Sequence, residues 1–232
     1  VWVIRALRRA LAAEGRADEL DDLLDADNAS PEVTLVALPG LADPGEPRRP
    51  YAPTAFGSPG GDPHRVIAAT GGTVRVQDEG SQLVALALAA AAPITSGERW
   101  LDLCAGPGGK TALLAAIARE HDVTLEANEV IPTRARLVRN ALRAVPGEVV
   151  VHEEDGRSFG ASHPGAFDRI LVDAPCTGLG ALRRRPEARW RKTPADVAEL
   201  VPLQVELLSS ALHALAPGGI VAYVTCSPHL AE

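Results

Sequence analysis

The sequence predicts an α/β fold in which helices pack against a parallel sheet. From about residue 70 onward, apolar stretches of strand length alternate with helical segments. The predicted strands cover residues 99–104, 123–128, 149–153, 169–172 and 219–225, and the predicted helices between them cover residues 110–120, 132–144 and 195–215. Because strand–helix–strand repeats give parallel pairing, ligand-binding residues should follow the carboxyl ends of these strands.

A smaller mixed segment precedes this alternation. Its predicted elements are helices over residues 1–15 and 18–27, a strand over residues 33–38, and a loop or linker over residues 42–63 that is rich in Pro, Gly and Arg. A strand over 73–76 and a helix over 81–92 then lead into the main alternation. We therefore expect two parts, an N-terminal segment with its linker over residues 1–72 and a main domain over residues 73–232.

Composition excludes several classes of protein. With 232 residues, 46% hydrophobic and 23% charged, the chain can bury a core without disulfides. The longest apolar run, 83–94, is far shorter than the ~20 residues that a membrane span needs. Three cysteines favour a reducing compartment, and 3% aromatic residues argue against aromatic binding platforms. The net charge of −7 argues against nonspecific coating of nucleic acid. Because position 1 is Val, we expect the sequence to be a piece of a longer protein.

A glycine-rich loop follows the first strand of the main domain. The sequence there runs Asp102, Leu103, Cys104, Ala105, Gly106, Pro107, Gly108, Gly109, Lys110, Thr111. A phosphate-binding P-loop would need Gly at position 104, and a dinucleotide fingerprint would need Gly at position 111. An S-adenosylmethionine loop is the third interpretation. The loop alone does not decide between them.

Acidic residues follow the next two strands. Glu129 could accept hydrogen bonds from ribose hydroxyls, in dinucleotide and adenosylmethionine binders alike, but an acid there is also a common helix cap. Asp155 could accept a hydrogen bond from an adenine amino group, although Asp-Gly is equally typical of a plain turn.

Two cysteines follow the last two predicted strands. Cys176 lies in Asp173-Ala174-Pro175-Cys176-Thr177-Gly178, and Cys226 lies in Thr225-Cys226-Ser227. Cysteines are most often small buried hydrophobic residues. Because adjacent parallel strands end at one edge, these two could instead share a pocket as reactive thiols. Cys104, inside the glycine loop, is better explained as a packing or ligand-lining residue.

Together these stretches resemble the Sun (Fmu, RsmB) family of RNA 5-methylcytosine methyltransferases. The resemblance rests on DLCAGPGGKT, ANE, DAPCTGLGALRRRPEARW and YVTCSP, with VQDEGSQLVA upstream. It covers residues from about 74 to the end. It implies a class I, Rossmann-like, S-adenosyl-L-methionine-dependent methyltransferase that stops before its last strands, so that the 73–232 domain is C-terminally incomplete and residues 1–72 lead in from an RNA-binding domain.

The resemblance also implies roles for individual residues. Cys226 is the nucleophile that adds to carbon 6 of cytosine, Cys176 serves release of the product, Asp173 contacts the cytosine edge, and Lys110 contacts the ring or Asp173. Lys110 could also be an ordinary solvated lysine. The implied cofactor-binding residues are Cys104, Ala105, Gly106, Pro107, Gly108, Gly109, Lys110, Glu129, Asp155 and Asp173, and no metal is expected.

The implied partner is RNA, with 16S rRNA favoured and a looped or single-stranded target. The basic run of Arg183, Arg184, Arg185, Arg189, Arg191 and Lys192 is expected to face it, although such runs are often solvated helix faces. A monomer in the cytoplasm is expected. Two rivals stay open: a DNA cytosine-5 methyltransferase, whose nucleophile would be the Pro-Cys cysteine, and a relative that binds RNA without modifying it.

Overall fold

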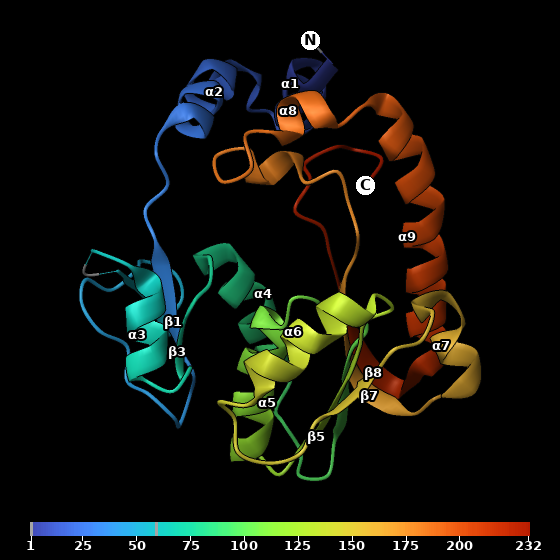
Figure 1. Ribbon diagram of the computed structural model, residues 1–232. Coiled ribbons are helices and arrows are strands. Elements are labelled where there is room, and N and C mark those ends of the chain that lie inside the picture. Colours follow the sequence, from blue (N-terminus) through green and yellow to red (C-terminus); the bar gives the residue numbers. More distant parts are fainter. Residues whose placement is uncertain (1, 59) are drawn as a thin grey trace. The chain divides into compact units, whose positions relative to one another are not determined.

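The computed structural model describes residues 2–58 and 60–232, and these form two compact units (Figure 1). The sheet unit contains residues 32–173 and 209–223, and the helical unit contains the segment that ends at Pro31 together with residues 174–208 and 224–232. Val1, in the predicted first helix, and Pro59, in the predicted loop, lie outside the described residues.

A five-stranded sheet organises the sheet unit. Its strands are β4 (Arg99–Asp102), β5 (Thr124–Asn128), β6 (Val150–His152), β7 (Phe167–Asp173) and β8 (Leu215–Val224), in the order β6-β5-β4-β7-β8. The pairs β4–β5, β4–β7 and β5–β6 are parallel. The predicted α/β class with a parallel sheet is therefore confirmed.

The helices α4 (Glu79–Ala90), α5 (Gly109–Glu120), α6 (Pro132–Leu142) and α7 (Gly156–Ser162) accompany this sheet. Helix α5 packs between α4 and α6, and every residue from Thr111 to Ala118 is buried, so its alanines permit close approach on all sides. Helix α7 was not predicted from the sequence. Its seven residues include two glycines and lack a helical apolar period, and the cap of Asp155 is what starts it.

A second, three-stranded sheet has the order β2-β1-β3, built from β1 (Thr34–Ala37), β2 (Ala55–Gly57) and β3 (Val74–Val76). All four residues of β1 are buried, and both neighbours pair with it antiparallel. The prediction of a loop or linker over 42–63 was therefore wrong at β2, which forms a strand because it pairs with the buried strand β1. Helix α3 (Pro63–Ala69), capped by Asp62, was also missed. The predicted division at residue 72 stays a prediction.

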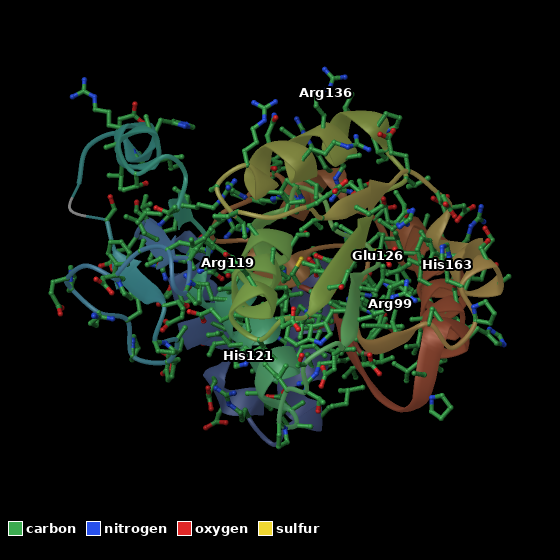
Figure 2. The ribbon with its side chains drawn as sticks, turned by 90° about the horizontal axis from the view of Figure 1, so that it is seen from below. Arg99, Arg119, His121, Glu126, Arg136 and His163 are labelled. Atoms are coloured by element: carbon green, nitrogen blue, oxygen red, sulfur yellow. The ribbon has the colours of Figure 1, made fainter. Side chains whose placement is uncertain are left out.

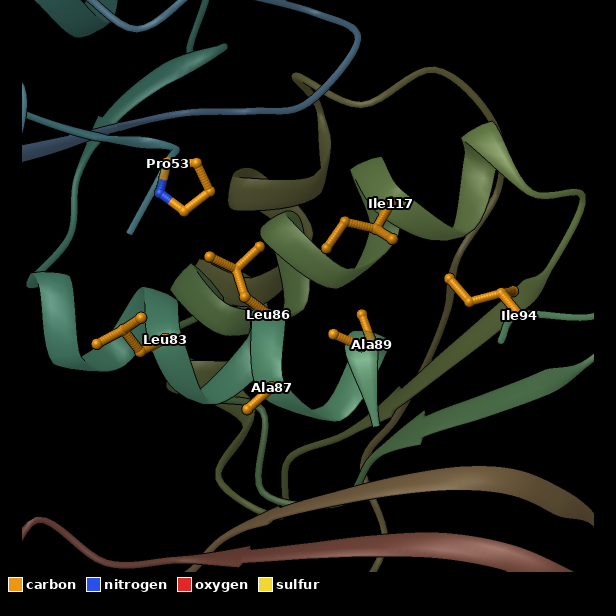
Figure 3. Close-up of a pocket in the computed structure, with 8 residues that line it drawn as sticks. Pro53, Leu83, Leu86, Ala87, Ala89, Ile94 and Ile117 are labelled. Carbon is orange, nitrogen blue, oxygen red and sulfur yellow. The ribbon is translucent and has the colours of Figure 1, made fainter. Parts of the chain in front are cut away.

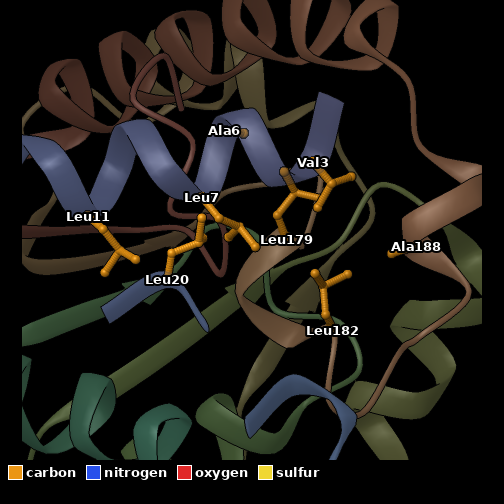
Figure 4. Packing of buried hydrophobic residues seen from close by; sticks show 8 residues of the cluster. All are labelled: Val3, Ala6, Leu7, Leu11, Leu20, Leu179, Leu182 and Ala188. Atoms are coloured by element: carbon orange, nitrogen blue, oxygen red, sulfur yellow. The ribbon is translucent and has the colours of Figure 1, made fainter. Parts of the chain in front are cut away.

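The helical unit contains α1 (Trp2–Ala13), the 3₁₀ turns η1 (Ala17–Glu19) and η2 (Leu179–Ala181), α2 (Leu20–Asn28), α8 (Ala188–Arg191) and most of α9 (Pro194–Ala214). One apolar face of α1 packs against residues that lie far along the chain (Figure 4). The buried cluster is Val3, Ala6, Leu7, Leu11, Leu20, Leu179, Leu182 and Ala188. The first helix therefore helps to fix the segment that follows the Pro-Cys motif.

Arg169 on β7 is a buried cation that ties the sheet to the end of α4. Its guanidinium donates to the carbonyls of Leu88 (3.1 Å), Ala89 (2.8 Å) and Pro93 (2.9 Å) and to the Glu98 carboxylate (2.7 Å). Its side chain is 2% exposed. The hydrogen bond from Arg169 lowers the pKa of Glu98 to about 2. These contacts compensate the desolvation of the charge.

Replacing Arg169 should therefore destabilise the fold strongly. Arg169→Met leaves Glu98 without its main cation and three carbonyls without a donor, and we expect a loss of about 3–5 kcal/mol in the free energy of unfolding, measured by urea titration. Arg99→Met is the matched control, since Arg99 is 46% exposed and pairs with Glu126 at 2.7 Å (Figure 2). That variant should lose less than about 1 kcal/mol. Equal losses would contradict the anchoring role of Arg169.

Candidate active site

The loop between β4 and α5 is built around close backbone approaches. Gly108 has φ +104°, and a Cβ there would lie 2.8 Å from both Ala141 Cβ and Val138 Cα of α6. A Cβ on Gly106 would collide with the Glu129 carboxylate. Glycine is therefore required at both positions, one for its left-handed backbone and both for space.

Glu129 closes a small ring of contacts with this loop. Its Oε2 accepts from the Gly106 amide at 3.1 Å, and its Oε1 accepts from the Ile131 amide at 3.0 Å. Arg134 lies 3.5 Å from Oε2 and donates to the Gly106 carbonyl at 2.6 Å. Glu129 is 4% exposed. A carboxylate has about four acceptor positions, so capacity for ligand hydroxyls is left. The contact of Arg134 with Glu129 and the loop was not predicted, because a single basic residue in a helical segment carries no pattern that indicates it.

Asp102, the last residue of β4, is fully buried beneath the loop. Its Oδ2 accepts from Thr111 Oγ1 at 2.7 Å. Within the part of the chain that the structure describes, its Oδ1 has no hydrogen-bond partner. Burial raises the pKa of Asp102 to about 7. Asp102 is therefore poised to interact with a cationic group.

The three cysteines, all within the described residues, are thiols and lie in different environments. Cys104 follows β4, and burial together with the carboxylates of Asp102, Asp173 and Glu129 raises the pKa of its thiol. A thiol that keeps its proton is a poor nucleophile. The raised pKa argues against a nucleophilic role for Cys104, and its role as a packing or ligand-lining residue stays a prediction.

Lys110 and Asp173 meet in the structure. Lys110 Nζ lies 2.8 Å from Asp173 Oδ2 and donates to Ser81 Oγ at 2.9 Å. Both charged side chains are mostly buried, 15% and 29% exposed. The predicted contact between Lys110 and Asp173 is present. Ser81, from the VQDEGSQLVA stretch, was missed as a partner.

Asp155 caps α7. Its carboxylate accepts from the Arg157 amide at 3.0 Å and from the Arg157 guanidinium at 2.6 Å. These hydrogen bonds lower the pKa of Asp155. Its side chain is 44% exposed. Asp155 is therefore a helix cap, which the sequence did not predict, and the contact with adenine stays a prediction.

In the helical unit, Cys176 and Cys226 come together, with their sulfur atoms 3.4 Å apart. The two loops are joined beside the thiols, since Gly180 N–H donates to the Cys226 carbonyl at 2.9 Å. The hydrogen bond with Cys226, followed by burial, raises the pKa of Cys176. The raised pKa favours the protonated form of the Cys176 thiol. The two cysteines, which were predicted from separate motifs to share a pocket, are therefore in contact.

Glu232 links the residues that follow the two cysteines. Its carboxylate accepts from the Thr177 amide at 2.7 Å, from the Thr177 hydroxyl, from Ser227 Oγ at 2.6 Å and from Gln204 Nε2 at 3.3 Å. Thr177 and Gln204 are 2% and 3% exposed. This cross-link was not predicted, because a lone glutamate after the Thr-Cys-Ser motif belongs to no recognisable sequence pattern.

Part of the basic run is structural. The Arg183 guanidinium donates to the carbonyls of Ala29 and Ser30, and the Arg189 guanidinium donates to the carbonyl of Asp27 at 2.8 Å. Both residues therefore hold the end of α2. The expectation that the whole run faces a substrate was too broad, because the run also anchors the first helices; Arg184, Arg185 and Arg191 are exposed.

An apolar hollow of about 540 Å³ lies over α4 and α5 (Figure 3). It is lined by Pro53, Leu83, Leu86, Ala87, Ala89, Ala90, Ile94 and Ile117. These side chains are neither titratable nor nucleophilic, so the hollow is no site for the predicted chemistry.

The parallel sheet, the glycine loop and the acids at the strand ends define a class I S-adenosylmethionine-dependent methyltransferase domain. The chain belongs to the 16S rRNA methyltransferase RsmB/F family, whose model matches residues 89–232. A Mycobacterium tuberculosis protein whose name describes it as a methyltransferase is 51% identical over the whole chain and 51% of its own length. Ribosomal RNA small subunit methyltransferase B of Salmonella paratyphi B is 41% identical over 67% of this chain and 35% of its own length.

A solved structure, that of PH0851, superposes with a TM-score of 0.86 at 28% identity, covering 97% of this chain and 52% of that one. The chain thus spans about half the length, or less, of the relatives that it matches. Over residues 2–58 and 60–232, no helix has the length and apolarity to cross a membrane, and no cluster of His, Cys, Asp and Glu side chains could hold a metal ion.

The residues of the loop fit S-adenosylmethionine. The cofactor carries an α-ammonium, a carboxylate and ribose hydroxyls, but no phosphate. The Asp102 Oδ1 atom without a partner suits a cation, and Glu129 has capacity for hydroxyl donors. The glycines keep the loop backbone open to a ligand.

The buried Asp102 makes stability depend on pH. Its pKa is about 7 in the folded chain against an ordinary 3.8, so the folded state holds a proton that the unfolded state releases between these values. The free energy of unfolding should therefore fall as pH rises from about 4 to about 7, and level off above. In Asp102→Asn this contribution should vanish. Urea titrations at several pH values measure it; parallel pH profiles for the two proteins would contradict the assignment.

Removing the carboxylate of Glu232 should destabilise the thiol loops. Glu232→Ala leaves the Thr177 amide without its acceptor. It also removes one partner each from the Thr177 and Ser227 hydroxyls, which lie 3.0 Å apart, and from Gln204 Nε2, which still donates to the Pro175 carbonyl at 2.9 Å. We expect a loss of about 1–3 kcal/mol in urea titration. Glu199→Ala, an exposed glutamate of α9, is the control and should change stability by less than about 0.5 kcal/mol. A Glu232→Ala loss as small as that of the control would show that the network is dispensable.

Proposed function

We propose that this chain transfers a methyl group from S-adenosyl-L-methionine to carbon 5 of a cytosine in RNA, through a covalent cysteine adduct. The observation that carries the proposal is the 3.4 Å contact between the sulfur atoms of Cys176 and Cys226. Two thiols in contact at the ends of two separate motifs suit a reaction that needs both a nucleophile and a proton carrier.

Carbon 5 of cytosine is too weak a nucleophile to take a methyl group unaided. Addition of the Cys226 thiolate to carbon 6 converts the ring into an enamine, which moves electron density onto carbon 5. We assign this role to Cys226 because its Thr-Cys-Ser motif resembles that of the Sun family, and the raised pKa of Cys176 is compatible with a Cys176 thiol that keeps its proton. S-adenosylmethionine supplies the electrophilic methyl on its sulfonium.

Release must then reverse the addition. The proton on carbon 5 leaves to a base, its electron pair re-forms the double bond between carbons 5 and 6, and the carbon 6–sulfur bond breaks to return the Cys226 thiolate. We assign Cys176 to this step, as the base or as the group that organises one. Asp173, held by Lys110 at 2.8 Å, is assigned to the N3 and N4 edge of the cytosine.

The proposed substrate is small-subunit ribosomal RNA. The family match and the name of the Salmonella relative support this, as do the exposed arginines at 184, 185 and 191, whose guanidinium groups suit phosphate oxygens. A target base must leave its stack to reach a thiolate, so a looped or single-stranded site is proposed. The reaction needs both thiols reduced, which suits the cytoplasm.

The two thiols should fail differently when replaced. Cys226→Ala should form neither product nor adduct, because the bond to carbon 6 cannot form. Cys176→Ala should accumulate a denaturant-resistant protein–RNA adduct, because release is blocked. The intact protein, incubated with rRNA and S-adenosylmethionine, is run on a denaturing gel, where an adduct migrates as a slower band.

The same gel tests the rival mechanisms. An adduct trapped by Cys226→Ala instead would assign the nucleophile to Cys176, as in DNA cytosine-5 methyltransferases. Methylation that persists in both variants without any adduct would rule out covalent catalysis. RNA binding by the unaltered protein with no methylation at all would favour a protein that only binds.

A further inference from the structure

Gln77 is a buried amide that the chemistry above leaves unused. It stands between β3 and α4, where its backbone N–H donates to the Thr34 carbonyl at 3.1 Å and its carbonyl accepts from Gln82 Nε2 at 3.0 Å. The residue is 7% exposed. Neither Oε1 nor Nε2 has a hydrogen-bond partner among the described residues. Buried amides are nearly always paired, so this one needs an explanation.

The amide lies across the start of α5. A Cβ built on Gly109, the first residue of α5, would be 3.7 Å from Gln77 Cδ and 3.8 Å from Nε2. The first N–H groups of a helix lack acceptors within the helix, and its dipole favours an anion there. The first turn of this twelve-residue helix carries no acidic side chain of its own. An unpaired amide and a helix N-terminus therefore adjoin one another.

We propose that Gln77 binds the amino-acid end of S-adenosylmethionine. Its Nε2 donates to the cofactor carboxylate, which also faces the N-terminus of α5, and its Oε1 accepts from the α-ammonium. A side-chain amide offers one donor group and one acceptor side by side, which matches an adjacent carboxylate and ammonium. The inference rests on the cofactor of the proposed function and is independent of the cytosine chemistry.

A neighbouring glutamine shows the contrast. Gln82, on α4, is also buried, but its Oε1 accepts from Thr54 Oγ1 at 2.7 Å and its Nε2 donates to the carbonyls of Leu35 and Gln77. Gln82 is therefore a structural residue that joins α4 to β1. It provides a matched control for Gln77 in the same sequence motif.

The test compares two ligands that differ only at the amino-acid end. S-adenosylhomocysteine carries the carboxylate and ammonium, and 5′-methylthioadenosine lacks both. Their dissociation constants are measured by calorimetry on the full chain, alongside its melting temperature without ligand. Gln77→Met keeps the volume of the side chain. It should raise the dissociation constant of S-adenosylhomocysteine by about ten- to hundredfold and leave that of methylthioadenosine unchanged.

The melting temperature separates a binding role from a structural one. Without ligand, Gln77→Met should be at least as stable as the unaltered chain, because it removes two unpaired polar atoms. Gln82→Met should melt lower and keep the ratio of the two dissociation constants. Gln77→Glu, a second variant, should weaken S-adenosylhomocysteine further by repelling its carboxylate.

Several results would overturn the inference. Equal weakening of both ligands by Gln77→Met, or no weakening of either, would remove Gln77 from the amino-acid end. If S-adenosylhomocysteine bound unchanged and less protein–RNA adduct formed, the Gln77 amide would instead contact the cytosine. If the unaltered chain bound neither ligand, the cofactor assignment itself would fall, a result distinct from a failure of Gln77 alone.

Discussion

Parallel pairing of β4 with β5 and with β7 is the constraint on which the candidate cofactor site of the sheet unit depends. Asp102, the last residue of β4, is in register with Ala127 of β5 and Leu171 of β7. The three strands therefore end at nearly the same level. Their exits bring Glu129 against the Gly106 amide and Asp173 against Lys110. The pairing thus converts three separate sequence motifs into one group of neighbouring side chains.

The sheet unit contains several destabilising features near the carboxyl ends of these strands, and contacts elsewhere in its core compensate them. Asp102 is buried with one oxygen unpaired, the Gln77 amide has no partner within the described residues, and Gly108 holds a left-handed backbone. Each feature costs free energy in the absence of ligand. Buried apolar strands and the contacts of Arg169 compensate them. Residues that lower stability at a strand edge are typical of sites that a ligand completes.

The sequence was most informative where the chain repeats a simple pattern and least informative where contacts are long-range. The alternation of apolar strands and helices predicted the five strands, and the motifs predicted that Cys176 and Cys226 would meet. Strand β2 and helix α7 were missed because each depends on a partner, a ladder on β1 or an Asp155 cap, more than on its own period. Contacts such as those of Arg134 and Glu232 could not be predicted, since a single charged residue is compatible with many environments. Arg183 and Arg189 are the opposite case, in which a clear pattern was misleading. Their basic run suggested contacts with RNA, whereas both guanidinium groups donate to backbone carbonyls at the end of α2.

The proposed reaction places the methyl group on carbon 5 of a cytosine in RNA. Mass spectrometry of nucleosides tests it most directly, after the intact protein has acted on unmodified small-subunit rRNA with S-adenosylmethionine that carries a deuterated methyl group. We expect the label in 5-methylcytidine at a defined site, with loss of the hydrogen of carbon 5. Label on a ring nitrogen, on an exocyclic amine or on a ribose hydroxyl would contradict it, since none of those atoms needs a thiolate at carbon 6.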